Sequence, residues 1–519
     1  MNGARALLST LVGAGVEVCF ANPGTSEMHF VAALDEVPAM RGVLCLFEGV
    51  ATGAADGYAR VAGRPATTLL HLGPGLGNGL ANLHNARRAR TPVVNVVGDH
   101  ATYHTRYDAP LESDIASIAR SVSGWYRSAA RADDVAGDAA DAVAAAMGPP
   151  GCVATLVLPA DSSWSDSATG PCPPRPVRRP AGVPADTVDE VAKALRSGER
   201  SALLLGGSAL RAPALGAASR VCVATGASLL GETFPANLER GAGIPAVDRL
   251  GYFSEMAQAQ LDGVRHLALV DAKSPVSFFA YPGKASDLVP PGCTVHTLAR
   301  SGDDAPAALE ALADAVGAPA DGAAPAPASR PQRPSGALSP ESLAAAIGAT
   351  LPEGAIVADE GNTAGLFAPG ATAGSPPHDW LCLTGGAIGQ GLPVAVGAAV
   401  AAPDRRVIAL EADGSALYTL QSWWTMARAG LDVTTILLNN HSYAVLNMEL
   451  DRVGADAPGP RAREMLDLGH PSIDYVHLAK GLGLHAARAE SAEAFAEELG
   501  RALATPGPSL VEAVVPSLL

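Results

Sequence analysis

Residues Leu410–Tyr443 read LEADGSALYTLQSWWTMARAGLDVTTILLNNHSY and hold two apolar runs separated by a helix-like segment. The first run, Arg406–Leu410, leads into the acidic turn Asp413-Gly414-Ser415, and the second, Val433–Leu438, ends in Asn439-Asn440. Parallel strands joined through a helix end at the same edge of a sheet, so we expect the two turns to lie close together. Their side-chain oxygens suit a small divalent cation that clamps a phosphorylated ligand.

The types of ligand in the two turns favour magnesium. Mg²⁺ prefers oxygen ligands in octahedral geometry and commonly keeps positions for substrate phosphates. One carboxylate and one amide oxygen supply little protein charge, which leaves room for a diphosphate. Gly414 permits a tight turn, and a helix that begins near Ser415 would point free N–H groups at an anion. The alternative is an ordinary strand–helix–strand unit, because DGS and NN are common turn sequences.

A second acidic residue, Glu48, follows the apolar run Val43–Phe47 and precedes a helix of small residues, Gly49–Arg60. One interpretation is a carboxylate at a helix N-terminus, which the helix dipole stabilises. The other interpretation is functional. An apolar niche favours the protonated form of a carboxyl group, which can then share its proton with a ligand nitrogen.

The two stretches together resemble the signature of the thiamin diphosphate (ThDP) enzymes. The metal motif of that family begins GDG and ends NN, and here Ala412 replaces its first glycine. The resemblance implies that Asp413, the Asn440 side chain and the Ser442 backbone carbonyl hold Mg²⁺. It also implies cofactor contacts from five further residues, with Ser415 at the diphosphate: Asn362, Thr363, Gly414, Ser415 and Tyr443.

The segment Gly53–Arg60, GAADGYAR, matches the helix that follows the activating glutamate of the family nearly letter for letter. The resemblance implies that Glu48 hydrogen-bonds N1′ of the cofactor's aminopyrimidine and favours the imino tautomer that removes the C2 proton. The Gly-rich segment Thr384–Pro393 matches as well. There Gly386 would accept from the 4′-amino group, and Ile388 would support the bent cofactor. The protein mainly orients and tunes the cofactor, which performs the bond breaking.

Two motifs resemble benzoylformate decarboxylases. Asn22–Glu27, NPGTSE, places the Thr25 hydroxyl where the decarboxylase has a serine that contacts the substrate carboxylate. Leu70–Asn78, LHLGPGLGN, places His71 at the position of the catalytic histidine. Imidazole has an ordinary pKa of about 6.5, which suits proton transfer to an intermediate. The alternatives are a turn or capping role for Thr25 and a structural role for His71.

The pattern also departs from that decarboxylase. Its second catalytic histidine has no counterpart in Ser274–Tyr281, where Ala280 aligns with it. Because loss of one general acid typically lowers a rate by about 10²–10⁴, simple benzoylformate decarboxylation is doubtful. Glu449 replaces an aromatic residue of the family and could bind a substrate amine or hydroxyl, or lie on a solvated helix face. The substrate pocket that the resemblance implies consists of Thr25, His71, Leu111, Leu446 and Glu449.

Two Pro-rich stretches, Thr169–Ala185 and Gly317–Gly336, predict extended linkers. They divide the 519 residues into a predicted pyrimidine-binding domain (1–168), a central domain (186–316) and a domain for diphosphate and Mg²⁺ (337–519). Each alternates apolar runs with helical stretches, which favours an α/β fold of three doubly wound parallel sheets. The expected strands are Glu17–Ala21, Val43–Phe47, Thr67–Leu72, Val93–Gly98, Val153–Leu158, Ala202–Leu205, His266–Val270, Ala355–Ala358, Trp380–Leu383, Val407–Leu410, Thr434–Leu438 and Ser509–Val515.

Composition excludes several classes of protein. The formal net charge of −16 argues against non-specific nucleic-acid binding, which needs a basic surface. The seven cysteines are dispersed without CxxC pairs, which is typical of reduced thiols in a cytoplasmic protein. The N-terminus lacks the layout of a cleavable signal. No apolar run is long enough to predict a membrane span. We therefore expect a cytoplasmic protein with neither nucleic-acid nor membrane partners.

The resemblance as a whole implies a ThDP- and Mg²⁺-dependent enzyme that acts on a 2-oxo acid. Loss of CO₂ would leave an enamine, which is either protonated to an aldehyde or added to an aldehyde or second keto acid. In this family the pyrimidine and diphosphate sides of one site come from different subunits. We therefore expect a homodimer or homotetramer in which Glu48 of one chain meets Asp413 of another.

Two further hypotheses remain open. The first is an acetolactate synthase large subunit, which acts in branched-chain amino-acid synthesis. Such synthases carry FAD in the middle domain, but residues 185–318 show no convincing FAD-binding pattern, so FAD is possible and not predicted. The second is a catalytically silent paralogue that binds ThDP, or a regulatory partner of a true synthase. The intact Glu48, Asp413 and Asn440 argue against a silent protein.

Overall fold

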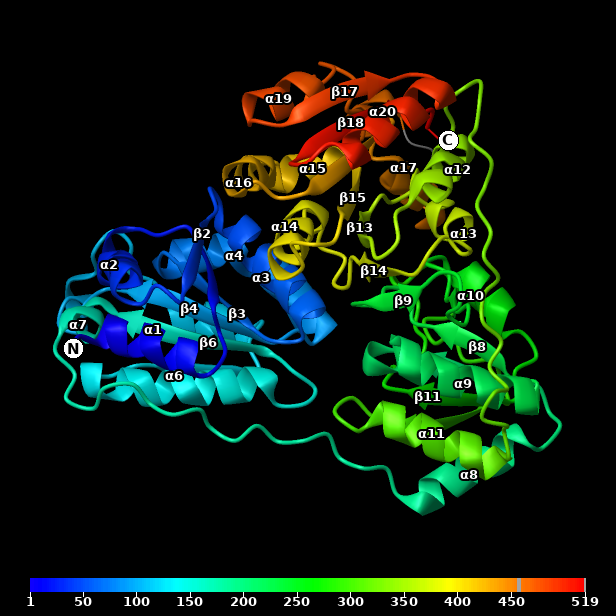
Figure 1. Cartoon of the computed structure of the whole chain (residues 1–519), viewed down its shortest axis with the longest axis horizontal. Helices are drawn as coiled ribbons and strands as arrows, with labels where there is room; N and C mark the ends of the chain where they lie inside the picture. The colour runs from blue at the N-terminus through cyan, green and yellow to red at the C-terminus, as the bar shows by residue number, and fades with distance from the viewer. Residues whose placement is uncertain (455–458, 518–519) are drawn as a thin grey trace.

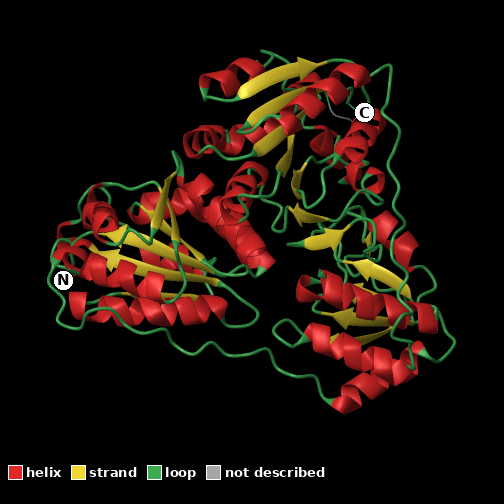
Figure 2. Cartoon of the chain, in the orientation of Figure 1, coloured by secondary structure: helices red, strands yellow, loops and turns green. Residues whose placement is uncertain are grey.

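The computed structural model describes residues 1–454 and 459–517, which form three parallel-dominated sheets flanked by helices (Figures 1 and 2). This confirms the predicted α/β fold of three doubly wound sheets. The strands of each sheet lie within one of the three predicted residue ranges, with the exception of β9. In the described part of the chain, no helix combines the length and apolar character needed to cross a membrane.

The N-terminal sheet has the strand order β2-β1-β3-β4-β6-β5, and all of its strands are parallel. Its central strands are buried on both faces, as expected for near-continuous apolar runs in a parallel sheet. The strands are β1 (Val18–Ala21), β2 (Arg41–Leu44), β3 (Ala66–Leu70), β4 (Val93–Asp99), β5 (Trp125–Ser128) and β6 (Val153–Pro159). The helices are α1 (Gly3–Gly13), η1 (Thr25–Glu27), α2 (Met28–Glu36), α3 (Glu48–Ala62), α4 (Leu72–Ala89), η2 (Thr105–Tyr107), α5 (Ile115–Arg120), α6 (Ala132–Met147) and α7 (Ala160–Trp164).

The middle sheet has the order β10-β8-β7-β11-β12 and is also parallel throughout. Its strands are β7 (Ser201–Leu205), β8 (Ser228–Gly231), β10 (Asp248–Arg249), β11 (His266–Val270) and β12 (Thr294–Ala299). The helices are α8 (Ala185–Leu195), η3 (Gly207–Leu210), α9 (Ala212–Thr225), α10 (Ser254–Leu261) and α11 (Ala305–Val316). A long segment without helix or strand leads from α7 to α8 along the outside of the molecule (Figure 1).

The C-terminal sheet has the order β17-β18-β16-β15-β13-β14-β9. Its last strand, β9 (Leu238–Arg240), comes from the middle region and pairs antiparallel with β14. The other strands are β13 (Ile356–Glu360), β14 (His378–Cys382), β15 (Val407–Ala412), β16 (Val433–Asn439), β17 (His485–Ala489) and β18 (Ser509–Val514). The helices are α12 (Pro340–Thr350), α13 (Ala368–Ala371), α14 (Gly391–Ala401), α15 (Asp413–Thr419), α16 (Gln421–Ala429), α17 (Ala444–Arg452), α18 (Pro460–Glu464), α19 (Tyr475–Gly481) and α20 (Ala492–Ala504).

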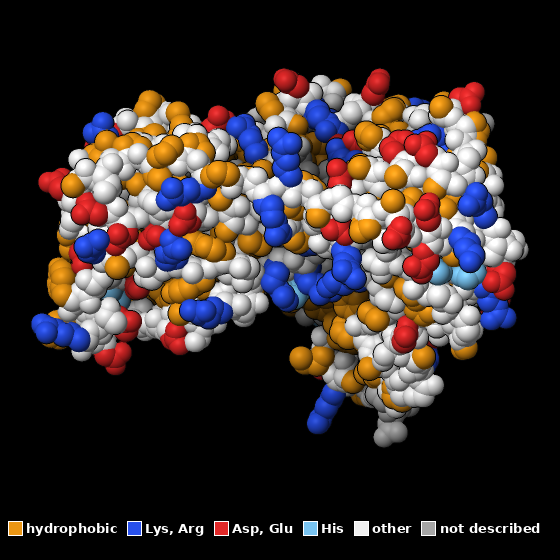
Figure 3. All heavy atoms as spheres, turned by 90° about the horizontal axis from the view of Figure 1, so that it is seen from below, with side chains coloured by type: hydrophobic (Ala, Val, Ile, Leu, Met, Phe, Trp, Pro, Cys, Tyr) orange, Lys and Arg blue, Asp and Glu red, His pale blue; other side chains and the backbone are white. Residues whose placement is uncertain are grey.

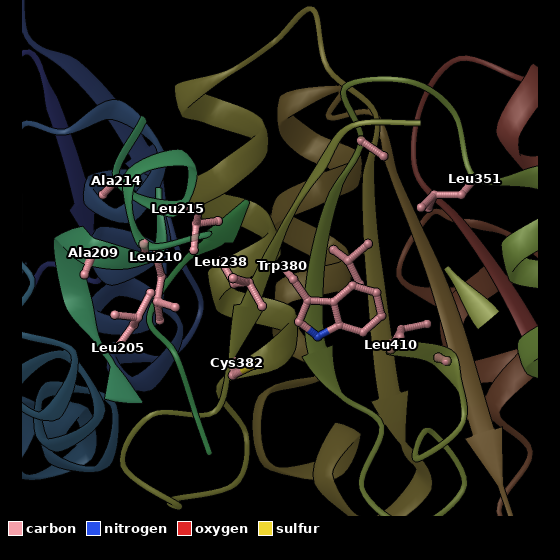
Figure 4. Packing of buried hydrophobic residues seen from close by; sticks show 14 of the residues in the cluster. Leu205, Ala209, Leu210, Ala214, Leu215, Leu238, Leu351, Trp380, Cys382 and Leu410 are labelled. Carbon is pink, nitrogen blue, oxygen red and sulfur yellow. The ribbon is translucent and has the colours of Figure 1, made fainter. Parts of the chain in front are cut away.

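Two hydrophobic clusters join the three sheets into one structure. In the first, the fully buried Trp380 lies between Leu238 of the middle region and Leu410 of the C-terminal sheet (Figure 4). The second cluster contains residues of both α3 and α14, which cross closely. A Cβ atom on Gly57 would overlap the backbone of Val394, so glycine is required for this close helix crossing.

One predicted strand ends earlier than expected. The run Val43–Phe47 was expected to be extended throughout, but β2 ends at Leu44. Phe47 is the N-cap of α3, and Glu48 is the first residue of that helix rather than the end of a strand. The predicted helix Gly49–Arg60 is present within α3.

Candidate active site

Glu48 is buried at the N-terminal end of α3, with 5% of its surface exposed. Its Oε2 accepts a hydrogen bond of 3.0 Å from Asn78 Nδ2 of α4. A Cβ atom on Gly75 would lie 3.0 Å from Glu48 Oε1, so the glycine allows α4 to approach the carboxyl closely. The neutral amide of Asn78 permits either protonation state of Glu48. The geometry therefore suits a carboxyl group that shares a proton with a ligand.

His71 lies directly between β3 and α4 and contacts a buried carboxylate that the sequence prediction did not assign. Its Nδ1 is 2.8 Å from Oε2 of Glu27, which also accepts 2.7 Å from the backbone N–H of Gly24. Burial raises the pKa of Glu27, and the charge of His71 opposes that rise. A carboxylate on one ring nitrogen fixes the orientation of an imidazole and leaves the other nitrogen available for proton transfer.

The turn that carries Thr25 packs against the His71 ring. A Cβ atom on Gly24 would overlap the imidazole, so only glycine allows this contact. Thr25 begins the short helix η1 and is exposed. The structure therefore places Thr25 and His71, the two predicted catalytic residues of this region, on adjoining segments. The sequence signal for Glu27 was its place in the same NPGTSE motif.

The Gly-rich segment before α14 is held by polar side chains of α4. Asn82 Nδ2 donates to the carbonyls of Gly49 (2.8 Å) and Gly389 (3.1 Å), which links the Glu48 helix to this segment. Asn85 Nδ2 donates 2.8 Å to the Ala387 carbonyl. Gly386 has a φ angle of +76°, and Ile388 beside it is half-buried. The backbone that would face an aminopyrimidine is thus rigidly positioned.

A buried ion pair connects α3 to the same segment. Arg60 and Asp56 form a 2.6 Å salt bridge with side chains that are 2% and 0% exposed. Arg60 also donates to the carbonyl of Cys382 (2.8 Å) and to Thr384 Oγ1 (2.9 Å). Gln390 Nε2 completes the network with a 2.9 Å hydrogen bond to Asp56. The Arg and Asp of the GAADGYAR motif therefore bind Thr384 and Gln390 of the Gly-rich segment, respectively.

Asp413 is the first residue of α15 and lies against the loop that contains Asn440. Its Oδ1 accepts 2.9 Å from the N–H of Gly414, whereas its Oδ2 is buried without a hydrogen-bond partner. Burial raises the pKa of Asp413, and the backbone N–H groups of Gly414, His441 and Asn440 oppose that rise. A buried, unpartnered carboxylate oxygen is costly unless a ligand satisfies it.

The second loop presents the remaining predicted metal ligands. Asn440 Oδ1 accepts 3.0 Å from the N–H of Ser442, and His441 between them has a φ angle of +56°. Across residues 1–454 and 459–517, no group of three or more His, Cys, Asp or Glu side chains could hold a metal. A site with one carboxylate, one amide oxygen and one backbone carbonyl needs no such group. This donor set fits Mg²⁺, which takes hard oxygen ligands and retains several positions for phosphate or water.

The residues predicted to contact the diphosphate lie around the same turn. Asn362, which follows β13 with a φ angle of +46°, donates 3.2 Å from Nδ2 to Ser415 Oγ. Thr363 is the next residue in that turn and is half-buried. The Tyr443 ring packs directly on Gly414, where a Cβ atom would overlap it. The turns after β13, β15 and β16 thus meet at one edge of the sheet, as predicted for a phosphate-binding site.

The predicted pocket residues differ in their surroundings. Leu111 and Leu446 are 39% and 44% exposed. The Glu449 carboxylate accepts hydrogen bonds from Tyr281 (2.8 Å) and Tyr252 (3.3 Å) of the middle region, so it does not lie on a solvated helix face. Phe278, in the segment that lacks the second histidine, packs against Gly386, where a Cβ atom would be 2.6 Å from the ring.

Two family models match parts of this chain, and individual relatives match nearly its whole length. The thiamine pyrophosphate enzyme N-terminal TPP-binding domain matches residues 1–118, and the C-terminal TPP-binding domain matches residues 359–513. A Mycobacterium tuberculosis protein provisionally named acetolactate synthase large subunit IlvX is 61% identical, and the match covers 100% of both chains. The benzoylformate decarboxylase of Pseudomonas aeruginosa is 30% identical, with 96% of each chain covered.

Solved structures show the same architecture. The ThDP-dependent 4-hydroxybenzoylformate decarboxylase of Rhodococcus jostii superposes with a TM-score of 0.86 and 25% identity, and the match covers 99% of each chain. Glu48 lies within the first matched range, and Asp413 and Asn440 lie within the second. The chain therefore belongs to the family of thiamine pyrophosphate-dependent enzymes, related to both the acetolactate synthases and the benzoylformate decarboxylases.

Proposed function

We propose that this protein is a ThDP- and Mg²⁺-dependent enzyme that removes CO₂ from a 2-oxo acid. The product is then an aldehyde, or the remaining fragment is joined to a second carbonyl compound. The observation that carries this proposal is the pairing of His71 with the buried Glu27 against the turn of Thr25. In this proposal His71 is an oriented proton carrier, and Thr25, which follows Gly24 in that turn, supplies a hydroxyl that can hold a substrate carboxylate.

The proposed site residues form two groups, and the first would hold the metal and the diphosphate. Asp413, Asn440 and Ser442 would hold Mg²⁺, and Ser415 with Asn362 and Thr363 would hold the diphosphate. When bound, ThDP would supply a nucleophilic carbon for the keto carbon of the substrate, and its cationic ring would supply the electron sink for decarboxylation.

The second group handles protons and substrate. Glu48 holds a proton at the pyrimidine nitrogen, and the Gly386 carbonyl and the Ile388 side chain fix the orientation of the cofactor. Thr25 binds the carboxylate that is lost. His71, held by Glu27, delivers a proton to the carbon that carried it. Leu111, Leu446 and Glu449 would line the rest of the proposed pocket.

The test is a substrate screen of the purified protein with ThDP and Mg²⁺. The panel contains pyruvate, branched-chain 2-oxo acids and phenylglyoxylate, with and without aldehyde acceptors, and products are identified by mass spectrometry. We expect one class of 2-oxo acid to be consumed by the wild-type protein and not by Glu48→Gln. Bound ThDP with no consumption of any 2-oxo acid would instead identify a silent paralogue.

Acetolactate synthesis is the second candidate, because the 61% identical relative carries the name of a synthase large subunit. Pyruvate alone would then give acetolactate rather than acetaldehyde, and the same screen separates the two products. The seven cysteines are all free thiols, which supports the proposal that the enzyme works in the reducing cytoplasm.

A further inference from the structure

The middle sheet has the topology of a dinucleotide-binding domain. The chain passes from β7 to β8 on one side and later crosses to β11 on the other side, so the strand order reverses between β7 and β11. In doubly wound sheets, dinucleotides bind beyond the carboxyl ends of the strands at such a point. Their phosphates rest on the free N–H groups of the turn after the first strand. FAD is the dinucleotide to consider, because the resemblance to acetolactate synthases implies it as a possible cofactor of the middle domain.

The N–H groups of that turn are already bonded to acidic side chains. The Gly207 N–H, just after β7, donates 3.2 Å to Glu232 Oε1, which follows β8. The N–H and the hydroxyl of Ser208 donate 2.9 and 3.1 Å to Asp271 Oδ2, which follows β11. A diphosphate at this place would find the donors occupied and would face two carboxylates.

A cationic side chain from another domain, Arg90, lies against the same turn. Arg90 follows α4 of the N-terminal domain with a φ angle of +58°. Its Nη1 bonds the Asp271 carboxylate and the Ser301 hydroxyl, and its Nη2 donates 3.1 Å to the Asp271 carbonyl. A Cβ atom on Gly207 would lie 3.1 Å from Arg90 Nη2, so the guanidinium sits against the turn itself.

A second contact between the same two domains adjoins this one. A Cβ atom on Gly302, which follows Ser301, would lie 3.4 Å from the Pro149 carbonyl carbon of the N-terminal domain. Lys and Arg side chains gather along the junction between the two lobes when the molecule is viewed from below (Figure 3). The chain that links the two domains, between α7 and α8, forms neither helix nor strand, so side-chain contacts must set their relative position.

We propose that the crevice at the carboxyl end of the middle sheet is a socket for Arg90, which fixes the N-terminal domain onto the middle domain. The crevice therefore does not accommodate FAD or another dinucleotide. Asp271 serves two functions in this socket, because it satisfies the Ser208 N–H and receives the guanidinium. This inference concerns only the middle domain and holds whichever 2-oxo acid the enzyme uses.

A double-mutant cycle on the holoprotein tests the socket. We compare Arg90→Ala, Asp271→Asn and the double variant by calorimetric Tm in the presence of ThDP and Mg²⁺. The matched control is Arg88→Ala, because Arg88 is exposed at the same end of α4. Each single variant should lower Tm and speed proteolysis of the α7–α8 linker, and the double variant should lose little more than one of them. Additive losses, or an equal loss in Arg88→Ala, would overturn the proposal.

A milder variant and a binding measurement complete the test. If Arg90→Ala does not fold, Arg90→Lys replaces it, because lysine keeps the charge but cannot make the forked contact with Asp271 and Ser301. Equilibrium dialysis of the wild-type holoprotein against FAD, and separately against ADP, should show no retention of either at micromolar concentration. Retention of FAD by the wild-type protein would show that the crevice is a cofactor site and would refute the socket.

Discussion

Glu27 gives His71 a defined orientation, and the two side chains act as one unit. The buried carboxylate accepts from His71 Nδ1 and from the Gly24 N–H, so the ring, the turn and the carboxylate cannot move independently. Glu27 is therefore a positioning residue, and His71 is the residue that would touch the reacting atoms.

Replacement of Glu27 by glutamine should change the pH profile of the reaction as well as its rate. Glutamine keeps the shape of the side chain but does not titrate, so the acid limb that the buried Glu27 carboxyl gives to kcat, at a pKa raised by burial, should disappear. His71→Ala should cost more, about 10²–10⁴ in kcat, because the proton donor itself is lost. Steady-state kinetics from pH 5 to 9 measure both effects. An unshifted profile in Glu27→Gln would show that Glu27 is merely structural.

Two carboxyl groups, Glu360 and Glu411, face each other beneath the Gly-rich segment. They are register partners on the adjacent strands β13 and β15, and both are buried. Glu360 accepts from the N–H groups of Gly389 (2.7 Å) and Gly391 (2.5 Å). Burial raises the pKa of Glu360 to about 7, and burial together with the Glu360 charge raises the pKa of Glu411.

This pair predicts that stability falls as the pH rises. In the folded protein the pair keeps a proton up to a pKa of about 7, whereas the unfolded chain releases it near the ordinary carboxyl value of 4.5. The folded state therefore binds more protons between these values, and stability is lost as pH rises through this window. Glu411→Gln should flatten the dependence of Tm on pH between 5 and 8. Glu490→Gln, an exposed carboxyl, is the control and should keep the wild-type slope.

Among the elements, the packing of α3 against α14 does most to join the Glu48 helix to the C-terminal sheet of the same chain. The helices cross closely through glycines, and Asp56 with Arg60 ties α3 to the strand end and the Gly-rich segment that precede α14. The Asp56 carboxylate and the Arg60 guanidinium are both buried, so each charge is stabilised mainly by the other. The network explains why a short motif after Glu48 needs both an Asp and an Arg four residues apart.

Asp56→Ala should destabilise the protein strongly. It leaves the Arg60 guanidinium buried without its counter-charge, and breaking such a pair typically costs about 3–5 kcal/mol. The Arg64–Glu17 salt bridge is the matched comparison, because both of its side chains are nearly half exposed. Glu17→Ala should therefore cost only about 0–1 kcal/mol. Urea unfolding at pH 7 measures both, and equal losses would contradict a special role for the buried pair.

The elements that could be predicted from the sequence are those with a strong local signal. The strands β4, β6, β11, β15 and β16 are near-continuous apolar runs buried on both faces, and the predicted ranges match them within a residue or two. The prediction missed β5, β8, β10, β12 and β17, which have mixed polar residues or lie near sheet edges. The three-residue strand β9 forms only by pairing with β14, across more than a hundred residues of chain.

The same limit applies to the site. Glu48, His71 and Asp413 are proposed as site residues from the sequence because each lies in a contiguous motif. The roles of Glu27, Glu232 and Asp271 depend on contacts between distant segments, which no local pattern encodes. Likewise, Glu449 could not be placed until the structure brought Tyr252 and Tyr281 against it.

At the scale of the whole molecule, the remaining question is whether Glu48 and Asp413 of one active site belong to the same chain. The fold family predicts that they come from different subunits, and closed two-fold symmetry would then give two equivalent sites per dimer. Neither Glu48→Gln nor Asp413→Ala should be active alone. The first should bind ThDP without turnover, and the second should lose Mg²⁺-dependent ThDP binding, as calorimetry can show.

Mixing the two inactive variants distinguishes the arrangements. If the sites are shared, a mixed dimer holds one site with both defects and one site with neither, since wild-type Glu48 of one chain meets wild-type Asp413 of the other. Random reassembly after mild dissociation should then restore roughly a quarter of wild-type activity. If each chain builds its own site, every site keeps one defect and the mixture stays inactive. Restored activity would therefore require an oligomer, because each working site must draw on two chains.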